Sequence, residues 1–294
     1  MLRGALLTAA LSSMTVPAAA ANVAGIRAVS HVEPDAARDA AYWTVSRMAA
    51  ATPPEVRSGH HAPGPPAGIP RARPGGGSRV VGALFYRNGR GDHYCTASVV
   101  HTPKKDLILT AAHCLYDPGD RAYATHIAFV PAYRTARPHP YGVWPVRRTW
   151  LDSRWTSHGD RDLDFGFAAL GRVGGRHIVD VVGSNRLLVG QGFTNRVTVI
   201  GYPVKAHDPA DRPIWCANRT FKLSRYQVGF DCKGFYGGTS GSPWIVRYDN
   251  RTQSGMVIGT LGGHQRGGST HWRSYSALFD GDISKLIAKA DEEA

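Results

Sequence analysis

From residue 79 to the C-terminus, apolar residues come in short runs, each about the length of one β-strand. The runs read RVVGALFY, CTASVV, LILT, HIAFVPA, DFGFAAL, RVTVIGYP, SPWIVRY, GMVIGTL and YSALF. Gly, Pro, Asp and Asn separate them, and this spacing predicts antiparallel strands in a sandwich or barrel. Residues 80–294 are many for one small barrel and suit two packed barrels, which we divide near residue 185.

Two segments outside this pattern are predicted to be helical. In the C-terminal tail, Ile283, Leu286, Ile287 and Ala290 recur at the i, i+3, i+4, i+7 spacing of one helical face. We expect an amphipathic helix there that docks on the barrels. Near the other end, DAARDAAYWTVSRMAAA is the single helical candidate of a small leader.

The first 79 residues are predicted to be a signal peptide, a leader and a linker. Residues 1–21 carry one positive charge, a short apolar stretch and a run of alanines, which indicates a secretory signal cleaved after residue 20 or 21. Its apolar part is too short to span a bilayer, so we expect no membrane anchor. Residues 22–79 are interpreted as a propeptide or leader. Their part from 52 to 78 is rich in Pro and Gly, which predicts a flexible linker.

Composition and charge narrow the possible functions. The chain has 294 residues, and an apolar fraction of 43% is enough to bury a core. Its 34 Gly and 19 Pro favour turns and short strands over a helical bundle. The formal net charge of +13 would suit a nucleic-acid-binding protein. However, Arg is scattered along the chain without a basic helix, zinc-finger or RNP motif, so we expect no specific nucleic-acid partner.

The first candidate for chemistry is His113, which follows a strand end and two alanines in LILTAAHCL. The small alanines let an imidazole emerge close to the backbone, although a single histidine is more often a packed residue. In an exported protein, a Cys95–Cys114 bridge would tie the preceding strand to this turn. Four cysteines allow three pairings, and we choose this one with Cys216–Cys232 because each closes a local loop.

The second candidate is Asp164, in the stretch DRDLDFGFAAL. A carboxylate at the start of an apolar strand is costly to bury unless it is paired or hydrogen-bonded. We interpret Asp160 and Asp162 as solvated residues at the strand start. Asp164, directly before the apolar run, is the candidate for holding a histidine in one tautomer.

The third candidate is Ser240, in the stretch FYGGTSGSPW. Nucleophilic serine chemistry needs a base for the Oγ and backbone N–H groups that face the developing oxyanion. Gly238 has no Cβ and can turn its N–H inward, so this N–H and that of Ser240 would form a two-donor oxyanion hole. Gly241 leaves room for a substrate, and Ser242 is interpreted as structural. A Gly/Ser loop alone is more often a turn than an active site.

The order His113, Asp164, Ser240 separates the possible serine-hydrolase scaffolds. The α/β-hydrolase elbow requires G-x-S-x-G, and here Ser242 stands where the last Gly belongs. Subtilisin-like enzymes place Asp before His. The order in this chain is that of the chymotrypsin arrangement.

The segments TAAHC, DFGF and GGTSGSP resemble the signature segments of the chymotrypsin-like serine proteases over most of residues 80–294. The nearest likeness is to the bacterial V8-like glutamyl-endopeptidase branch. GGTSGSP resembles the GGNSGSP of that branch, and MVIGTLGGH followed by YSALF resembles its late strand pair. The resemblance implies an all-β fold of two packed six-stranded antiparallel barrels, with the active site in the cleft between them.

The resemblance also implies a role for each candidate. His113 would be the general base, Asp164 its orienting partner and Ser240 the nucleophile, while the N–H groups of Gly238 and Ser240 would form the oxyanion hole. The implied reaction is hydrolysis of peptide bonds in proteins or peptides through an acyl-enzyme. No metal and no organic cofactor is implied.

Two departures from the family pattern concern activation and specificity. Digestive-type members carry an Asp before the nucleophile that pairs with a new α-amino group, whereas this chain has Thr239. Cleavage before Val80 would therefore not create that ion pair. The trypsin-type Asp six residues before the nucleophile is replaced by Gly234, and Leu261 stands where the glutamyl branch has His.

The candidates for the specificity pocket are Gly234, Phe235, Thr260, Leu261, Gly262 and His264. With no acid at residue 234, cleavage after Lys or Arg is not supported. We expect an uncharged or acidic residue before the scissile bond.

The sequence as a whole predicts a secreted, monomeric, extracellular serine endopeptidase. One alternative is an inactive protease-like binding protein with a basic surface, but the complete set of three catalytic candidates disfavours it. Another is a secreted basic protein that binds nucleic acid or a cell-wall polymer, which would bind in a salt-sensitive way and hydrolyse nothing.

Overall fold

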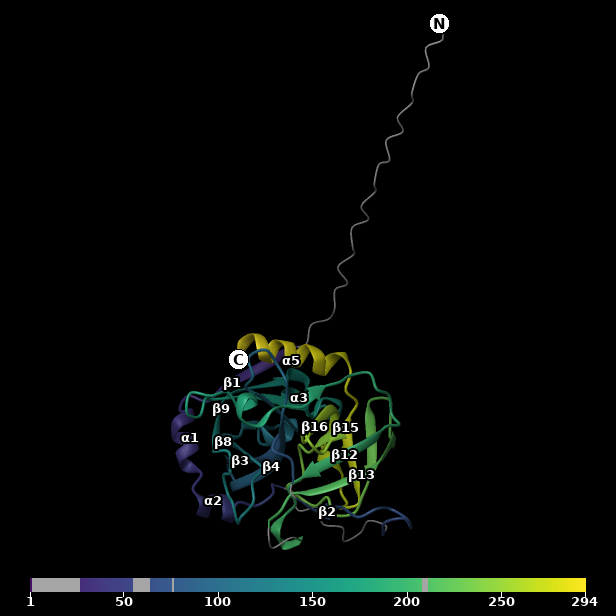
Figure 1. Cartoon of the computed structure of the whole chain (residues 1–294), viewed down its shortest axis with the longest axis horizontal. Helices are drawn as coiled ribbons and strands as arrows, with labels where there is room; N and C mark the ends of the chain where they lie inside the picture. The colour runs from purple at the N-terminus through teal and green to yellow at the C-terminus, as the bar shows by residue number, and fades with distance from the viewer. Residues whose placement is uncertain (2–26, 55–63, 76, 208–210) are drawn as a thin grey trace.

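The computed structural model describes residues 1, 27–54, 64–75, 77–207 and 211–294. Apart from Met1, the predicted signal peptide lies outside these residues. Within the described part there are two large, mostly antiparallel sheets that curl up side by side, and a separate two-stranded hairpin (Figure 1). The first sheet is formed mainly by the earlier part of the chain, coloured purple to teal. The second is formed mainly by the later part, coloured green to yellow.

The first sheet contains a closed barrel. In the described chain its six strands follow the order β9-β10-β5-β4-β3-β8, and β8 pairs back with β9. The bounds are β3 (Val81–Asn88), β4 (Gly91–Val99), β5 (Leu107–Thr110), β8 (Thr125–Pro131), β9 (Trp144–Asp152) and β10 (Gly166–Leu170). The short hairpin is β6 (Tyr116–Asp117) with β7 (Ala122–Tyr123). Most side chains of β3, β4 and β5 are buried, because the barrel interior covers one face and other segments cover the outside.

The second sheet curls in the same way. Its main strands follow the order β16-β15-β12-β13-β14-β17. Beyond the end of β16, the Gly262 N–H donates to the Tyr275 carbonyl of β17 at 3.0 Å and brings the two ends of the sheet together. The bounds are β11 (Arg186–Leu187), β12 (Arg196–Gly201), β13 (Ile214–Lys222), β14 (Gln227–Asp231), β15 (Pro243–Asp249), β16 (Ser254–Thr260) and β17 (Arg273–Ala277). The predicted fold class, all-β with two barrels, is confirmed.

The C-terminal helix α5 (Gly281–Glu293) joins the two barrels. It follows the last strand of the second barrel but packs on β9 and β10 of the first. Ile283, Leu286 and Ala290 are fully buried, so the predicted amphipathic helix is confirmed. The remaining helices of the barrels are α3 (Ser153–His158), α4 (Ile178–Val182), η1 (Ala112–Cys114), η2 (Arg161–Leu163), η3 (Lys205–His207) and η4 (His264–Gly267). Across the described residues, no helix is both long and apolar enough to cross a membrane.

The leader is built into the first barrel. Its strand β1 (Ala28–Val32) pairs with β9. The predicted single helix is wrong, because the segment forms α1 (Ala36–Tyr42) and α2 (Val45–Ala50). The break lies at Trp43, which leaves the helical conformation, and the Thr44 Oγ1 caps α2 by accepting the Arg47 N–H at 3.2 Å. Figure 1 shows both helices at the edge of the first barrel, where α1 packs on β8 and β9.

Packing of Trp43 accounts for this break. Trp43, Met48 and Ala51 are buried in the same apolar cluster as the strands of the first barrel. The Trp43 indole N–H donates to the His126 carbonyl of β8. Beyond α2, Thr52 bonds both ways with β4, through the Asp92 carbonyl and the Tyr94 N–H, each at 3.2 Å. The leader is therefore continuous with the core.

The second half of the linker also differs from expectation. Residues 55–63 and 76 lie outside the described part. The described residues 70–75 are not a flexible linker, since β2 (Arg73–Pro74) pairs with β13 of the second barrel. Composition could not predict this pairing, because the partner strand lies more than a hundred residues further along the chain.

Replacement of Trp43 by Ala should destabilise the whole first barrel. The substitution leaves a cavity in the core, and removal of a buried Trp costs about 3–5 kcal/mol. Val45 on α2 is a matched control because it is 47% exposed, and Val45→Ala should change the free energy of unfolding by less than about 0.5 kcal/mol. Urea unfolding measures both. Equal losses in the free energy of unfolding for the two variants would mean that the leader is not part of the core.

Because of Glu33, the free energy of unfolding should depend on pH. Its side chain is only 5% exposed. Burial and the nearby Asp39 raise the pKa of Glu33 from 4.5 to about 7. The folded state therefore holds a proton that the unfolded state releases at lower pH. The free energy of unfolding should fall as pH rises from about 4.5 to about 7.

Glu33→Gln removes this titration. We expect the variant to equal the parent near pH 4.5 and to exceed its free energy of unfolding at pH 8 by on the order of 1–2 kcal/mol. Glu292→Gln, at an exposed position of α5, is the control and should keep the parental slope. Urea unfolding across this pH range checks the prediction, and an unchanged slope in Glu33→Gln would contradict it.

Candidate active site

His113 lies in a short turn whose preceding residues are small. Strand β5 ends at Thr110, two buried alanines follow, and η1 carries the histidine. The predicted bridge Cys95–Cys114 is present and ties η1 to β4. The other predicted bridge, Cys216–Cys232, is also present. The first of these bridges leaves the imidazole little freedom to move relative to the barrel.

Asp164 faces His113 from the start of β10. The His113 Nδ1 lies 2.8 Å from Asp164 Oδ2 and 3.0 Å from Oδ1, and the His113 backbone N–H donates to the same Oδ1 at 3.0 Å. Both side chains are 0% exposed. A carboxylate beside Nδ1 favours the tautomer with the proton on that nitrogen, which leaves the lone pair on Nε2.

A third donor completes the environment of the carboxylate. The Gly263 N–H donates to Asp164 Oδ2 at 2.7 Å. Gly262 lies so close that a Cβ there would stand 2.7 Å from the Asp164 carbonyl oxygen. The segment after β16 therefore packs directly on Asp164, and this contact requires glycine.

The loop of Ser240 meets the same segment. The Gly241 N–H donates to the Leu261 carbonyl at 2.7 Å, and the Leu261 N–H donates to the Ser242 carbonyl at 2.9 Å. From the other side, the Thr96 N–H of β4 donates to the Ser240 carbonyl at 2.7 Å. Leu261 stands two residues from Gly263, so one short segment contacts both Asp164 and the serine loop.

Contacts between β4 and β5 bring the serine loop toward the histidine. Thr110, three residues before His113, donates its hydroxyl to the Thr96 carbonyl at 2.8 Å. Gly241 has a φ of +84°, and a Cβ there would stand 1.9 Å from that carbonyl and 2.3 Å from the Thr110 Oγ1. These contacts place the serine loop against β4 and the end of β5, three residues before His113.

The backbone N–H groups near Ser240 differ in whether they donate a hydrogen bond to another part of the protein. The N–H groups of Thr239, Gly241 and Ser242 each donate to a backbone carbonyl. Those of Gly238 and Ser240 donate to no acceptor within the described ranges. Gly238 has a φ of +91°, and a Cβ there would stand 2.5 Å from the Tyr202 carbonyl. Two N–H groups with no protein acceptor beside a serine are the elements that an oxyanion hole needs.

The two serines of the loop have different surroundings. Ser242 is fully buried, and its Oγ would lie 2.1 Å from a Cβ on Gly201, so it packs against that backbone. Ser240 keeps slight exposure to solvent. Thr239 is buried and donates its hydroxyl to the Tyr236 carbonyl at 2.7 Å.

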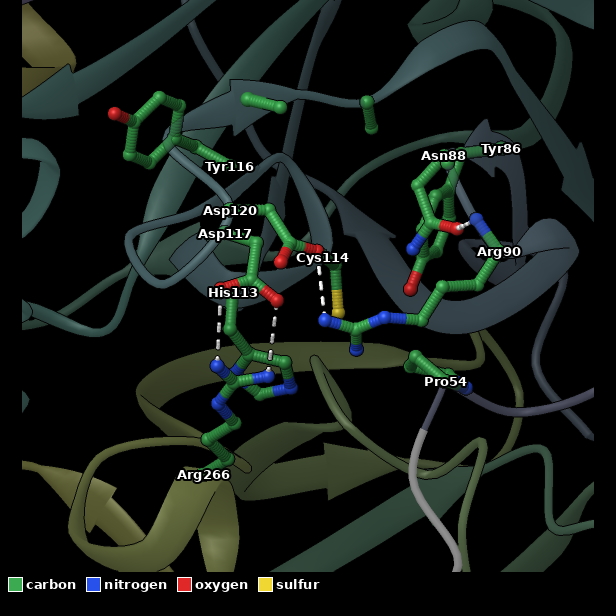
Figure 2. A pocket seen from close by; sticks show the side chains of 13 residues that line it. Pro54, Tyr86, Asn88, Arg90, His113, Cys114, Tyr116, Asp117, Asp120 and Arg266 are labelled. Atoms are coloured by element: carbon green, nitrogen blue, oxygen red, sulfur yellow. Dashed lines mark hydrogen bonds and ion pairs between the residues drawn. The ribbon is translucent and has the colours of Figure 1, made fainter.

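A cavity of about 320 Å³ opens beside His113. Figure 2 shows Arg266 beside the His113 ring, with its guanidinium bonded to Asp117. The Arg266 Nη2 lies 3.1 Å from Asp117 Oδ1, so this pair joins η4 of the second barrel to the β6–β7 hairpin. Burial alone would raise the pKa of Asp117, but the Arg266 charge and the Gly119 N–H outweigh it and lower the pKa.

Sequence reasoning named His113 and Cys114 but missed the other residues of this cavity. Arg90 and Asp120, 2.7 Å apart, line it together with Arg266, Asp117 and the leader residue Pro54. The Arg266–Asp117 pair joins residues 149 positions apart, and such a pairing leaves no local pattern.

The specificity-pocket candidates are placed as follows. Phe235 and Leu261 are fully buried in the core of the second barrel. His264 accepts a hydrogen bond from Arg161 at 2.8 Å, and burial together with the Arg161 charge lowers its pKa. Both effects favour the neutral imidazole of His264. The role of Gly234, Phe235, Thr260, Leu261, Gly262 and His264 in specificity stays a prediction.

Among the described residues, the grouping with metal-ligand spacing is Cys95, His113 and Cys114. Its two sulfurs are joined in a disulfide. Sulfur binds metal as a thiolate, so this grouping does not have the chemistry of a metal site.

Two packed antiparallel barrels with a C-terminal helix define the chymotrypsin-like serine protease fold, and comparison with solved structures agrees. Protease Anisep from Arthrobacter nicotinovorans matches at 25% identity and a TM-score of 0.66, over 75% of this chain and 99% of that chain. The thermostable serine protease AL20 from an extremophilic microorganism matches at 24% identity and a TM-score of 0.66, over 74% and 99%.

A third solved structure, a Glu endopeptidase in complex with MPD, matches at 16% identity and a TM-score of 0.59, over 76% of this chain and 98% of that chain. No protein-family model and no curated protein matches the sequence. The structural neighbours are proteases, and the predicted resemblance to the chymotrypsin-like serine protease fold is confirmed.

Substitution at Gly241 tests how tightly the serine loop is held. Gly241→Ala places a Cβ against the Thr96 carbonyl and strains a positive φ, so we expect a loss of about 3 kcal/mol or more in the free energy of unfolding. Gly192 also has a positive φ, +65°, but nothing lies within 4 Å of its Cβ position. Gly192→Ala should cost only about 1 kcal/mol. Urea unfolding compares them, and similar losses would contradict this packing.

Proposed function

We propose that the protein is a secreted serine endopeptidase that hydrolyses peptide bonds through an acyl-enzyme. His113 is the general base, Asp164 its orienting partner and Ser240 the nucleophile. The observation that carries this proposal is the buried pair of His113 and Asp164, 2.8 Å apart, next to a serine loop with two available N–H donors. The protease neighbours support the same reaction class.

In the first step the Ser240 oxygen attacks the carbonyl carbon of the scissile peptide, and its proton passes to the Nε2 of His113. The carbonyl oxygen becomes negative and accepts hydrogen bonds from the N–H groups of Gly238 and Ser240. His113 then gives the proton to the leaving nitrogen, the C–N bond breaks, and an ester to Ser240 remains.

In the second step water replaces the leaving amine. His113 takes a proton from the water, the hydroxide attacks the ester carbon, and the C–O bond to Ser240 breaks as the proton returns to the serine oxygen. Asp164 stays ionised throughout and stabilises the imidazolium that forms twice in the cycle. The hydrogen bonds from the His113 backbone and from Gly263 keep the carboxylate in place without adding a charge.

The chemistry of the surroundings supports an uncharged or acidic residue before the scissile bond. Residue 234 is Gly and provides no carboxylate for a Lys or Arg side chain. Nearby, Arg71, His207 and Lys233 are close enough to contribute to a lowered pKa of His271, which burial lowers most. These basic groups would oppose a cationic side chain.

Export is part of the proposal. The sequence begins with a segment of signal-peptide character, and both disulfides are of the kind that persists in an oxidising compartment. We propose that the protein acts on extracellular proteins or peptides as a monomer.

Ser240→Ala and Ser242→Ala form a matched pair that tests this function. The parent should cleave denatured casein and lose activity with a serine-directed phosphonate. Ser240→Ala should lower activity by at least about a thousandfold, because it removes the nucleophile. Ser242→Ala should keep a substantial part of the activity, because that side chain is only packed.

A digest of a peptide library, read by mass spectrometry, measures activity and side-chain preference together. Full activity in Ser240→Ala would overturn the mechanism. A parent that folds but cleaves nothing would instead favour the inactive binding protein.

A further inference from the structure

The loop that carries Ser240 is costly to hold in one conformation. Gly234, Gly238 and Gly241 all have positive φ, at +113°, +91° and +84°. Glycine loses more backbone freedom on folding than any other residue. Thr239 in this loop carries no charge, so the loop is not fixed by an ion pair from that position. Other contacts must order it.

The second half of the loop is held by packing around Tyr236. The Tyr236 ring lies between His207 and His271, with centroids 3.4 and 4.7 Å away. The Thr239 hydroxyl donates to the Tyr236 carbonyl, and the Val204 N–H donates to the Gly237 carbonyl at 2.8 Å. At the start of the loop, the N–H groups of Gly234 and Phe235 both donate to the His271 carbonyl at 2.9 Å, and a second set of contacts comes from the opposite side.

Residues 70–75, which the sequence predicted to be part of a linker, contact the start of the loop. The Lys233 N–H donates to the Pro70 carbonyl at 2.8 Å, and the Ala72 N–H donates to the Lys233 carbonyl at 2.8 Å. The same segment continues onto β13, where the Gly75 N–H donates to the Pro213 carbonyl at 3.0 Å. Residues 70–75 therefore join the beginning of the serine loop to the edge of the second barrel.

The side chain of Ala72 fits into the space that Gly234 leaves. Ala72 is buried, and its Cβ lies 3.3 Å from the position that a Cβ on Gly234 would take. The methyl group is thus in contact with a residue six positions before Ser240. A larger or charged side chain at 72 would push the segment off the loop.

The next residues of the segment are fixed as well. The Ser78 hydroxyl donates to the Gln253 carbonyl at 2.6 Å, and the Arg79 N–H donates to the Gln253 side-chain oxygen at 3.1 Å. Both bonds lie before Val80, the residue that would begin a chain cut after Arg79. These contacts of residues 70–75, Ser78 and Arg79 are all with the second barrel rather than with a removable domain.

We propose that residues 70–75 are a permanent brace that orders the Ser240 loop, so that Ala72 is a positioning residue for the proposed protease reaction. The brace remains bound whether or not the chain is cut after Arg79. Its backbone hydrogen bonds hold the loop in one conformation, which the uncharged Thr239 cannot do through an ion pair. Its effect on catalysis rests on the proposed function, but the brace itself does not.

The test compares Ala72→Glu with Ala67→Glu in the full chain. Ala67 lies just before this segment and is exposed, so the two variants have the same composition and charge. Hydrogen exchange of the peptide spanning residues 233–242, followed by mass spectrometry, reports the order of the loop without needing activity. In Ala72→Glu this peptide should exchange at least about tenfold faster, while β12 and β15 keep parental rates.

Ala67→Glu should match the parent throughout. Parental exchange of residues 233–242 in Ala72→Glu would overturn the brace. Reaction of Ser240 with a fluorophosphonate probe, measured on the same samples, tests the consequence. Ala72→Glu should react at least about tenfold more slowly, because the oxyanion donors and the nucleophile are no longer held in place.

If the parent does not react with the probe, the proposed function is contradicted. The hydrogen-exchange rates of residues 233–242 still show whether residues 70–75 order the serine loop. If Ala72→Glu does not fold, Gly75→Ala and Gly64→Ala decide by the same criterion. A Cβ on Gly75 would stand 2.8 Å from the Trp215 ring, whereas nothing lies within 4 Å at Gly64. We expect exchange of residues 233–242 to rise about threefold in the former only, and equal rates would overturn the proposal.

Discussion

Burial of the Asp164 carboxylate is the constraint on which the candidate site depends. An unpaired buried carboxylate costs several kcal/mol, so the fold is stable only if hydrogen-bond donors surround it. Two donors come from His113 and one from Gly263. These donors belong to segments far apart in the sequence, one in each barrel. Satisfying one group therefore fixes the imidazole and also holds the segment after β16 where the serine loop packs on it.

The serine loop is a different physical problem, because it contains no charge to satisfy. Its conformation depends on close backbone approach, which only glycine permits at residues 238 and 241. Such a loop pays a large entropic cost and is ordered by what surrounds it. The Tyr236 stack and the Ala72 contact act on its two halves. In this account the N-terminal segment is part of the folded protein, with β1 and the leader helices packing onto one barrel and β2 extending the other.

The sequence predicted the fold class because most strands are short apolar runs between turn residues. It missed β9, where Arg147 and Arg148 interrupt the apolar pattern, β13, whose WCANRT section is mostly polar, and the short β14. Strands of this kind are stabilised by their neighbours in the sheet, which no local pattern reveals. The same reason explains why β1 and β2 were not predicted.

The candidate catalytic residues could be proposed because each lies in a short local motif, and their order selects one scaffold. Both disulfides were predictable because each closes a small loop. By contrast, Gly263 as a donor to Asp164 and the Arg266–Asp117 pair depend on how two barrels meet. The helix break at Trp43 has a similar cause, since burial of the indole in the core outweighs the local preference for one long helix.

The central claim is that Ser240 forms a covalent intermediate, and trapping that intermediate tests it most directly. The parent protein is mixed with an activated ester substrate and quenched in acid, and its peptides are then analysed by mass spectrometry. The account predicts that the acyl group is found on the peptide that contains Ser240, with fragment ions that place it on that residue. It also predicts that the adduct disappears when the protein is returned to neutral pH before the quench. An acyl group on another residue, or no adduct while the ester is still turned over, would contradict the account.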